Sequence, residues 1–382
     1  MRVYLFLLFF SFWFSFTSSS QVNIGTLKSV FLSEPRLFKV DLPRNYDTTK
    51  KYATIYVLDG QVIGDLVSGT NHLYSSFGIV QEAIVVSIFQ DTSRWKDCAY
   101  SKNGDLTVRG EQFKKFISEE LIPYIDSNYA TSLYRVIVGH SFTANFIHFF
   151  LLDNSPLFTS FIAVSPYFSK GMVDSVYNAG VNSRTPIFYY LSFSENDLSG
   201  HIESVSMAIK KLKRISNPNF ETRFEKIPLK SHVSQLPNAI ESGLSFSNKY
   251  YCFSKQKFNK KMFRTQTVLS TLNSFYAKSS LVYKNKHIPT NQDYEFCTFL
   301  IDAYGKKSEL LEFGNACITN APSLSIGYYS LGYYFEHTNE LEKALTYYKI
   351  GFSKLGSDIM NIEDFKQPIL QIENKIKATN KQ

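Results

Sequence analysis

Cysteine is scarce in this sequence, and its few residues are widely spaced. The 382 residues contain four cysteines, none of them in a C-x-x-C pair: Cys98, Cys252, Cys297 and Cys317. Such spacing is typical neither of a disulfide framework nor of a structural zinc site. A single disulfide such as Cys297 with Cys317 is compatible with the sequence but is not required by it.

Long apolar runs are missing as well, apart from a short one at the N-terminus. Arg2 precedes an apolar run from Val3 to Phe10, which continues with serines to Phe16 and ends in small residues up to Ser20. These are the parts of a secretory signal peptide, and the apolar core is too short to span a bilayer comfortably. We therefore expect cleavage after residues 1–20 and a secreted or periplasmic protein without a stable membrane span. An uncleaved anchor is the alternative.

Acidic residues are absent between Lys249 and Thr290, where the basic residues are concentrated. The formal net charge of +8 is therefore a local excess, and the rest of the chain is close to neutral. A local excess of this kind does not predict a nucleic-acid partner. We interpret residues 251–290 as a basic connector, and favour a solvated segment over a site for an anionic surface.

What the sequence does contain is a regular alternation of strand and helix patterns. Its length suggests either one large domain with an appendage or two domains, and 44% hydrophobic with 19% charged residues is typical of a globular chain. Apolar strands are predicted at residues 55–58, 82–90, 136–138, 161–164, 187–192 and 220–227, and a loosely alternating edge strand at residues 30–40. Helical spacing occurs at residues 110–129, from Thr143 onward and at residues 201–215. The pattern predicts an α/β domain over residues 21–250, with a mostly parallel sheet covered by helices on both faces.

One of these strands leads into a turn that carries a candidate nucleophile. The segment Gly139-His140-Ser141-Phe142 separates an apolar strand from an apolar helix that begins near Thr143. It matches the G-x-S-x-G nucleophile elbow except that Thr143 replaces the last glycine. A serine in such a turn projects from the sheet, with a helix N-terminus behind it. An ordinary turn between a strand and a helix is the competing interpretation.

A candidate base follows the last predicted strand. His232 lies in a polar loop, where a hydrolase of this type presents its histidine, and a neutral imidazole can accept and return the serine proton. An ordinary surface histidine is the alternative. The other six histidines are less well placed, namely His72, His140, His148, His201, His287 and His337.

Several stretches together resemble the esterase family of α/β-hydrolases that includes esterase D and the siderophore (enterobactin-type) esterases. The matching stretches are DLPRNY, YVLDG, RWKDCAYS, GEQFKKFISEELIPYIDSNY, YRVIVGHSFTANF, DNSPLFTSFIAVSPYF and IPLKSHVSQLPNAIESGLSF, within Val30 to Phe246. Their order and spacing make the combination specific. The resemblance implies that Ser141 is the nucleophile and His232 the base.

The resemblance also places the acid of a catalytic triad in the loop after residues 187–192. The family's glycine-x-x-acid pattern aligns with Ser194 to Asp197, so we favour Asp197, with Glu195 as the alternate acid. Because Ser194 stands where the family has glycine, the register stays open by about two residues. A carboxylate is needed there to orient the imidazole and to stabilise the imidazolium.

The remaining site residues are expected from the same hydrolase geometry. The backbone N–H of Phe142 and one from the Gly60-Gln61 turn, assigned to Gln61, would form the oxyanion hole. Trp95, Tyr167 and Phe168 are substrate-pocket candidates by resemblance, and ordinary packing aromatics by default. No cluster of ligand residues indicates a metal, and neither a metal nor an organic cofactor is expected.

The C-terminal part, residues 291–382, has a different pattern. Residues 325–355 resemble one tetratricopeptide-type helix pair, with small and large packing positions at Tyr328, Leu331, Gly332, Phe335, Ala344, Tyr348 and Gly351. A single pair cannot bury its own face. We expect this segment to dock on the hydrolase domain or to cap a short helical array, and favour a structural role over a peptide-binding module for a protein partner.

The sequence as a whole predicts a secreted serine hydrolase that cleaves a small carboxylic ester through an acyl-enzyme. Transfer of the acyl group to another acceptor and hydrolysis of a peptide remain alternatives. A catalytically silent hydrolase fold that serves as a scaffold is a third, because Thr143 and Ser194 depart from glycine.

Overall fold

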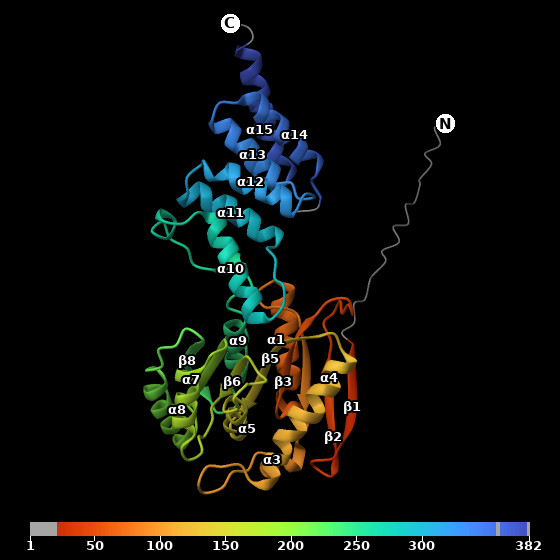
Figure 1. Ribbon diagram of the computed structural model, residues 1–382, viewed down its shortest axis with the longest axis vertical. Coiled ribbons are helices and arrows are strands. Elements are labelled where there is room, and N and C mark those ends of the chain that lie inside the picture. Colours follow the sequence, from red (N-terminus) through yellow and green to blue (C-terminus); the bar gives the residue numbers. More distant parts are fainter. Residues whose placement is uncertain (1–20, 357–359, 380–382) are drawn as a thin grey trace, which may run out of the picture.

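A computed structural model describes residues 21–356 and 360–379. Figure 1 shows two parts stacked along the long axis, a domain built around a β-sheet and a smaller domain built from helices. The predicted signal peptide lies outside the described residues. Among those residues, no helix combines the length and the apolar character needed to cross a membrane.

The sheet has eight strands in the order β1-β2-β4-β3-β5-β6-β7-β8. Strands β1, β2 and β4 pair antiparallel at one edge, and the remaining neighbours pair parallel. The strands are β1 (Val22–Ser29), β2 (Glu34–Asp41), β3 (Tyr52–Val57), β4 (Ala83–Ile88), β5 (Thr131–His140), β6 (Ser160–Val164), β7 (Ile187–Asn196) and β8 (Phe220–Ser231). The predicted mostly parallel α/β sheet is confirmed. Strand β1 was not predicted.

Side chains that alternate along the strands build two separate cores. Ile55 and Val57 face one side of the sheet, whereas Tyr56 faces the other. The first face is covered by α1 (Gly60–Ser76) and α9 (Leu236–Ser247). The second is covered by α3 (Val108–Lys115), α4 (Ile122–Asn128), α5 (Phe142–Phe146), α6 (His148–Leu151), α7 (Met172–Asn182) and α8 (Ser199–Leu212). The short α2 (Arg94–Asp97) lies in the loop after β4, and a π-helical turn, η2 (Phe116–Leu121), joins α3 to α4.

The helical domain consists of consecutive helices, each packed against its neighbours in sequence (Figure 1). They are α11 (Asn291–Tyr304), α12 (Glu309–Asn320), α13 (Ile326–His337), α14 (Leu341–Ser353) and α15 (Ile362–Thr379). The predicted helix pair corresponds to α13 and α14, whose tetratricopeptide character stays a prediction. All four cysteines are free and buried, so the structure contains no Cys297–Cys317 disulfide.

Helix α10 (Val268–Tyr283) joins the two domains within residues 251–290. Its last two residues, Val282 and Tyr283, belong to the core on the first face of the sheet, whereas Leu272 and Tyr276 belong to the core of the helical domain. The Tyr283 ring meets the Tyr134 ring edge-on at 4.9 Å. A helix buried at both ends holds the domains together more firmly than a solvated connector would.

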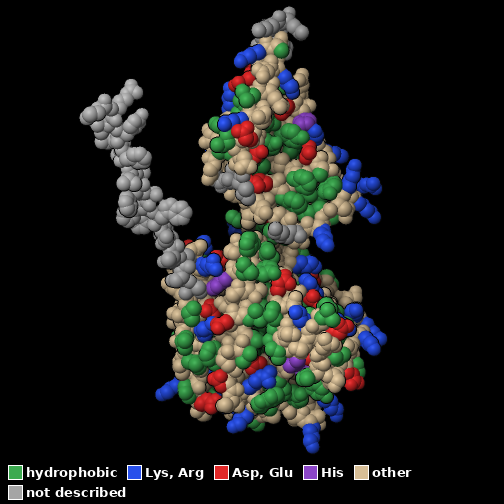
Figure 2. Space-filling view, turned by 180° about the vertical axis from the view of Figure 1, so that it is seen from behind, with side chains coloured by type: hydrophobic (Ala, Val, Ile, Leu, Met, Phe, Trp, Pro, Cys, Tyr) green, Lys and Arg blue, Asp and Glu red, His purple; other side chains and the backbone are tan. Residues whose placement is uncertain are grey.

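Two groups can be distinguished among the basic residues between Lys249 and Lys286. Lys249 and Lys278 form ion pairs with Glu221 of β8, at 2.6 and 3.3 Å. The other group is exposed in the loop before α10 and consists of Lys257, Lys260, Lys261 and Arg264. Figure 2 shows Lys and Arg side chains gathered on one flank of the helical domain.

Candidate active site

Ser141 stands at the tip of a strained turn between β5 and α5. Its backbone has φ 62° and ψ −117°, a region that residues other than glycine rarely adopt. The Ser141 N–H donates to the Val164 carbonyl at 2.8 Å, which ties the turn to β6. A Cβ on Gly139 would lie 2.6 Å from the Thr143 carbonyl oxygen, so this glycine is required for the close approach of the turn to its helix. The local geometry is that of a nucleophile elbow.

Two backbone N–H groups lie at the N-termini of helices that follow the neighbouring strands β3 and β5. Phe142 is the first residue of α5, and Gln61 is the second residue of α1, which begins directly after β3. Among the described residues, neither N–H donates a hydrogen bond to a protein acceptor. Orphan N–H groups at helix N-termini are suited to an oxyanion, because the helix dipole adds positive potential there.

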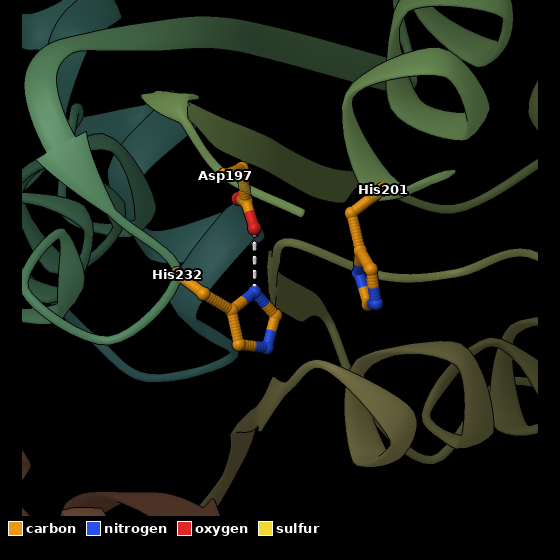
Figure 3. A group of neighbouring side chains, drawn as sticks. All are labelled: Asp197, His201 and His232. Carbon is orange, nitrogen blue, oxygen red and sulfur yellow. Dashed lines mark hydrogen bonds and ion pairs between the residues drawn. The ribbon is translucent and has the colours of Figure 1, made fainter. Parts of the chain in front are cut away.

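His232 lies directly after β8 and is bonded to Asp197, which follows β7. The His232 Nδ1 and the Asp197 Oδ1 are 2.6 Å apart (Figure 3). Because a carboxylate can only accept, Nδ1 carries the proton, and Nε2 of a neutral imidazole is left as an acceptor. Among the described residues, the Ser141 hydroxyl makes no hydrogen bond to a protein group. The hydrogen bonds of a catalytic serine often shorten only when substrate binds.

Asp197 is bound from several sides in addition to His232. Its Oδ2 accepts from the Ser165 hydroxyl at 2.7 Å and from the Gln235 side-chain amide at 2.8 Å, and its Oδ1 accepts from the Leu198 N–H at 2.8 Å. Burial by itself would raise the pKa of the Asp197 carboxyl. The hydrogen bonds from His232, Ser165, Gln235 and Leu198 outweigh burial and hold this pKa well below its usual range. The carboxylate therefore stays charged beside the imidazole.

The alternate acid, Glu195, is not brought to His232. Its carboxylate is exposed and forms an ion pair with Lys226 at 3.2 Å, and it accepts from the Leu229 N–H at 3.2 Å. These contacts, the Leu229 hydrogen bond foremost, lower the pKa of Glu195. Of the two candidate carboxylates, the structure places only Asp197 in contact with the imidazole.

Ser165, Gln235 and His201 were not identified from the sequence. Ser165 follows β6, the neighbour of β5 in the sheet, so its position at the end of an adjacent parallel strand was the available signal. The sequence ranks His201 below His232 as a site residue, yet its ring centre lies 4.7 Å from that of His232 (Figure 3). His201 Nδ1 donates to the Ser165 carbonyl at 2.8 Å, and burial lowers the pKa of His201. A second neutral imidazole therefore lines the site.

Asp197, His201 and His232 together offer three potential metal ligands. Their ligand atoms lie within 4.8 Å of one another. However, the separation of 2.6 Å between Asp197 Oδ1 and His232 Nδ1 is shorter than the roughly 3.3 Å between two ligands of tetrahedral zinc. As they are arranged, the carboxylate and the imidazole share a proton rather than a cation.

Two of the three substrate-pocket candidates face solvent at the site. Trp95 is 64% exposed and packs against Phe142 with ring centres 4.9 Å apart, and Tyr167 is 50% exposed and packs against His201 at 5.6 Å. Phe168, in contrast, is buried and lies against His148 at 5.0 Å. Its position corresponds to the packing interpretation and not to a pocket wall.

Comparisons with known proteins concern the sheet-bearing domain and its fold. Residues 29–204 match the family model described as "Putative esterase". A curated relative, the uncharacterized protein YjcH of Bacillus subtilis, is 24% identical over 193 residues, which cover 48% of this chain and 79% of that protein.

Solved structures share the fold at low sequence identity. An uncharacterised Capnocytophaga ochracea protein superposes with a TM-score of 0.75 at 17% identity, covering 93% of this chain and 100% of its own. An IroE-like serine hydrolase from Shewanella oneidensis gives 0.58 at 20% identity, covering 74% and 94%. The siderophore hydrolase EstB of Aspergillus nidulans gives 0.51 at 13% identity, covering 60% and 96%. Residues 29–204 of this chain therefore resemble the esterase family, and the sheet-bearing domain shares the fold of these hydrolases; together the matches support a carboxylic-ester hydrolase.

Proposed function

We propose that this esterase works by a Ser-His-Asp triad and an acyl-enzyme, with Ser141, His232 and Asp197 in those roles. The observation that carries the proposal is the strained Ser141 turn beside an imidazole whose Nδ1 is held by Asp197 at 2.6 Å. This hydrogen bond leaves Nε2 to act as the base. The low pKa of Asp197 favours an imidazolium without taking up its proton.

The reaction follows from these positions. Ser141 Oγ attacks the ester carbonyl while His232 Nε2 takes its proton, and the carbonyl oxygen becomes an oxyanion facing the N–H groups of Phe142 and Gln61. Collapse breaks the bond to the alcohol, which leaves with the proton from His232. Water then attacks the acyl-enzyme with the same proton transfers and releases the acid.

The departures from glycine do not favour a silent scaffold. Thr143 lies within α5 and Ser194 lies within β7, and neither has a positive φ. Glycine's conformational freedom is therefore unnecessary at both positions. This supports the active enzyme over the scaffold alternative.

The decisive experiment is hydrolysis of p-nitrophenyl acetate and butyrate by residues 21–382. We expect Ser141→Ala and His232→Ala to lower kcat by a factor on the order of 10⁴ or more without loss of folding. Ser127→Ala and His337→Ala, both exposed and outside the proposed site, are the matched controls. Equal rates in all five proteins would refute the triad.

We further propose that the chain is exported, on the strength of its N-terminal sequence. Expression of the full chain should deliver mature protein outside the cytoplasm, with Gln21 as the first residue in N-terminal sequencing. Retention of Met1 in a cytoplasmic fraction would contradict export.

The helical domain is proposed to be a structural unit docked through α10, as the burial of Val282 and Tyr283 in the hydrolase core supports. A protein partner bound through α11 to α15 is the alternative role.

A further inference from the structure

We propose that Thr143 is a positioning residue, whose hydroxyl fixes the two halves of the oxyanion site relative to each other. The inference rests on the proposed function, because it concerns the N–H groups of Phe142 and Gln61. These donors come from segments about eighty residues apart in the chain. Something must hold them at a separation that matches one oxygen atom, since errors of about 1 Å there lower rates strongly.

The Thr143 hydroxyl joins the two segments directly. It accepts from the His140 N–H at 2.9 Å, and it lies 3.0 Å from Asp59 Oδ2. His140 directly precedes the nucleophile, and Asp59 directly precedes the helix that presents Gln61. The same hydroxyl also lies 3.0 Å from the His140 carbonyl oxygen, but its single proton is drawn to the charged carboxylate.

Arg94 closes this connection into a ring. Its Nε donates to Asp59 Oδ1 at 2.7 Å, and its Nη2 donates to the His140 carbonyl at 3.2 Å. The backbone of His140, the Thr143 hydroxyl, the Asp59 carboxylate and the Arg94 guanidinium thus form one closed set of hydrogen bonds. Thr143 is fully buried and Asp59 is 4% exposed, so water competes little for these groups.

The turn at Asp59 is held on its other side by Gln90. The Asp59 N–H donates to the Gln90 side-chain oxygen at 3.1 Å, and the Gln90 N–H donates to the Gln61 side-chain oxygen at 3.2 Å. Asp59 itself has φ 53°, a left-handed conformation that needs such support. Because Asp59 N–H is already engaged, the next N–H groups along the turn remain for an oxyanion.

The ring also explains why threonine replaces the last glycine of the elbow motif. A glycine at this position would leave Asp59 Oδ2 and the His140 N–H without a shared partner. The residue that weakened the motif in the sequence is, in the structure, the direct link between the elbow and the turn after β3.

The test compares Thr143→Val, which keeps the shape and removes the hydroxyl, with Thr143→Ser, which keeps the hydroxyl. We expect Thr143→Val to lower kcat about tenfold to a hundredfold with KM within about twofold, and Thr143→Ser to restore most of the rate. Affinity for a boronic acid that mimics the tetrahedral oxyanion should fall with kcat. Thr54→Val is the matched control, because the Thr54 hydroxyl is buried in β3 and, among the described residues, lacks a partner.

Three outcomes would overturn the proposal: an unchanged kcat in Thr143→Val, an equal loss in Thr143→Ser, or an equal loss in Thr54→Val. A readout that needs no turnover is the pair of amide NMR signals of Phe142 and Gln61. Both should shift in Thr143→Val and stay near their original positions in Thr143→Ser, and unshifted signals would also overturn it. If the wild type is inactive, the proposed triad is refuted. The amide signals of Phe142 and Gln61 would then be the test of the role of Thr143.

Discussion

The molecule holds two buried carboxylates at the same edge of its sheet, Asp59 after β3 and Asp197 after β7, and they have different partners. The Asp59 side chain is 6% exposed and faces Arg94, a permanent cation, at 2.7 Å. The Asp197 side chain is fully buried and faces His232 at 2.6 Å, with neutral donors from Ser165 and Gln235 around it. The charge of Asp59 is neutralised at all times, whereas that of Asp197 is balanced only when His232 takes up a proton.

The difference indicates what each carboxylate can contribute. A fixed ion pair stabilises one arrangement of the backbone and does not respond to the reaction. A carboxylate without a fixed counter-charge stabilises the imidazolium that forms during attack, so its effect appears in the transition state. Asp59 is therefore suited to holding geometry, and Asp197 to catalysis.

The largest expected effect separates Asp197 from the alternate acid. Asp197→Asn should lower kcat by a factor on the order of 10⁴, because an amide cannot hold the required tautomer or stabilise the imidazolium. Glu195→Gln should leave kcat within about twofold, since Glu195 is engaged by Lys226 and Leu229. Steady-state kinetics with p-nitrophenyl butyrate measures both. A larger loss in Glu195→Gln would reverse the assignment of the acid.

The second effect concerns stability at the other carboxylate. Asp59→Asn should lower the free energy of unfolding by about 2 to 3 kcal/mol, because Arg94, 19% exposed, would lose its counter-charge. Urea denaturation monitored by circular dichroism gives this value. The double variant Asp59→Asn with Arg94→Met should recover part of the loss. If Asp197→Asn proves more destabilising than Asp59→Asn, the distinction between the two carboxylates fails.

The central sheet and the ends of its strands could be predicted from the sequence, because apolar strands and helical periodicity are local patterns. Strand β1 could not be predicted, because its apolar residues are exposed (Val22 51% and Ile24 68%) and its sequence resembles a polar linker. Helix α10 was also hidden, because its polar face and basic surroundings resemble a connector, and its burial depends on two separate domains.

The site divides in the same way. Ser141 and His232 follow strands and could be selected from order and spacing. The hydrogen-bond partners Ser165, Gln235 and Arg94 could not be selected in this way. Each is more than thirty residues away in sequence from the carboxylate that it binds, and no local pattern covers such a separation. Thr143 was noted only as a departure from glycine, since its contact with Asp59 joins residues far apart in sequence.

A third prediction concerns His140, which belongs to the Ser141 turn and also contacts His232. Its Nε2 donates to the His232 carbonyl at 2.9 Å, and burial, with the nearby His232, lowers the pKa of His140 from the usual 6.5 to about 4. The unfolded chain therefore binds this proton first as pH falls. Stability should decrease from about pH 6.5 towards pH 4, by on the order of 2 to 3 kcal/mol for this residue.

The measurement is urea denaturation at intervals from pH 7.5 to pH 4. His140→Gln keeps a donor for the His232 carbonyl but cannot titrate, so its stability should depend less on pH. His148, whose pKa burial also lowers to about 4, should account for much of the slope that remains. If the stability of His140→Gln depends on pH as steeply as that of the wild type, His140 is not held neutral in the folded protein.

The smallest effect tests the neutral donors around Asp197. Gln235→Leu removes the hydrogen bonds to Asp197 Oδ2 at 2.8 Å and to the His232 carbonyl at 3.0 Å. Each is worth about 1 kcal/mol, and losing them should lower kcat about threefold to tenfold by loosening the imidazole. Gln292→Leu, on the exposed side of α11, is the matched control. If Gln235→Leu costs as much as Asp197→Asn, the amide rather than the carboxylate charge governs His232, and Asp197 would then resemble Asp59 as a holder of geometry.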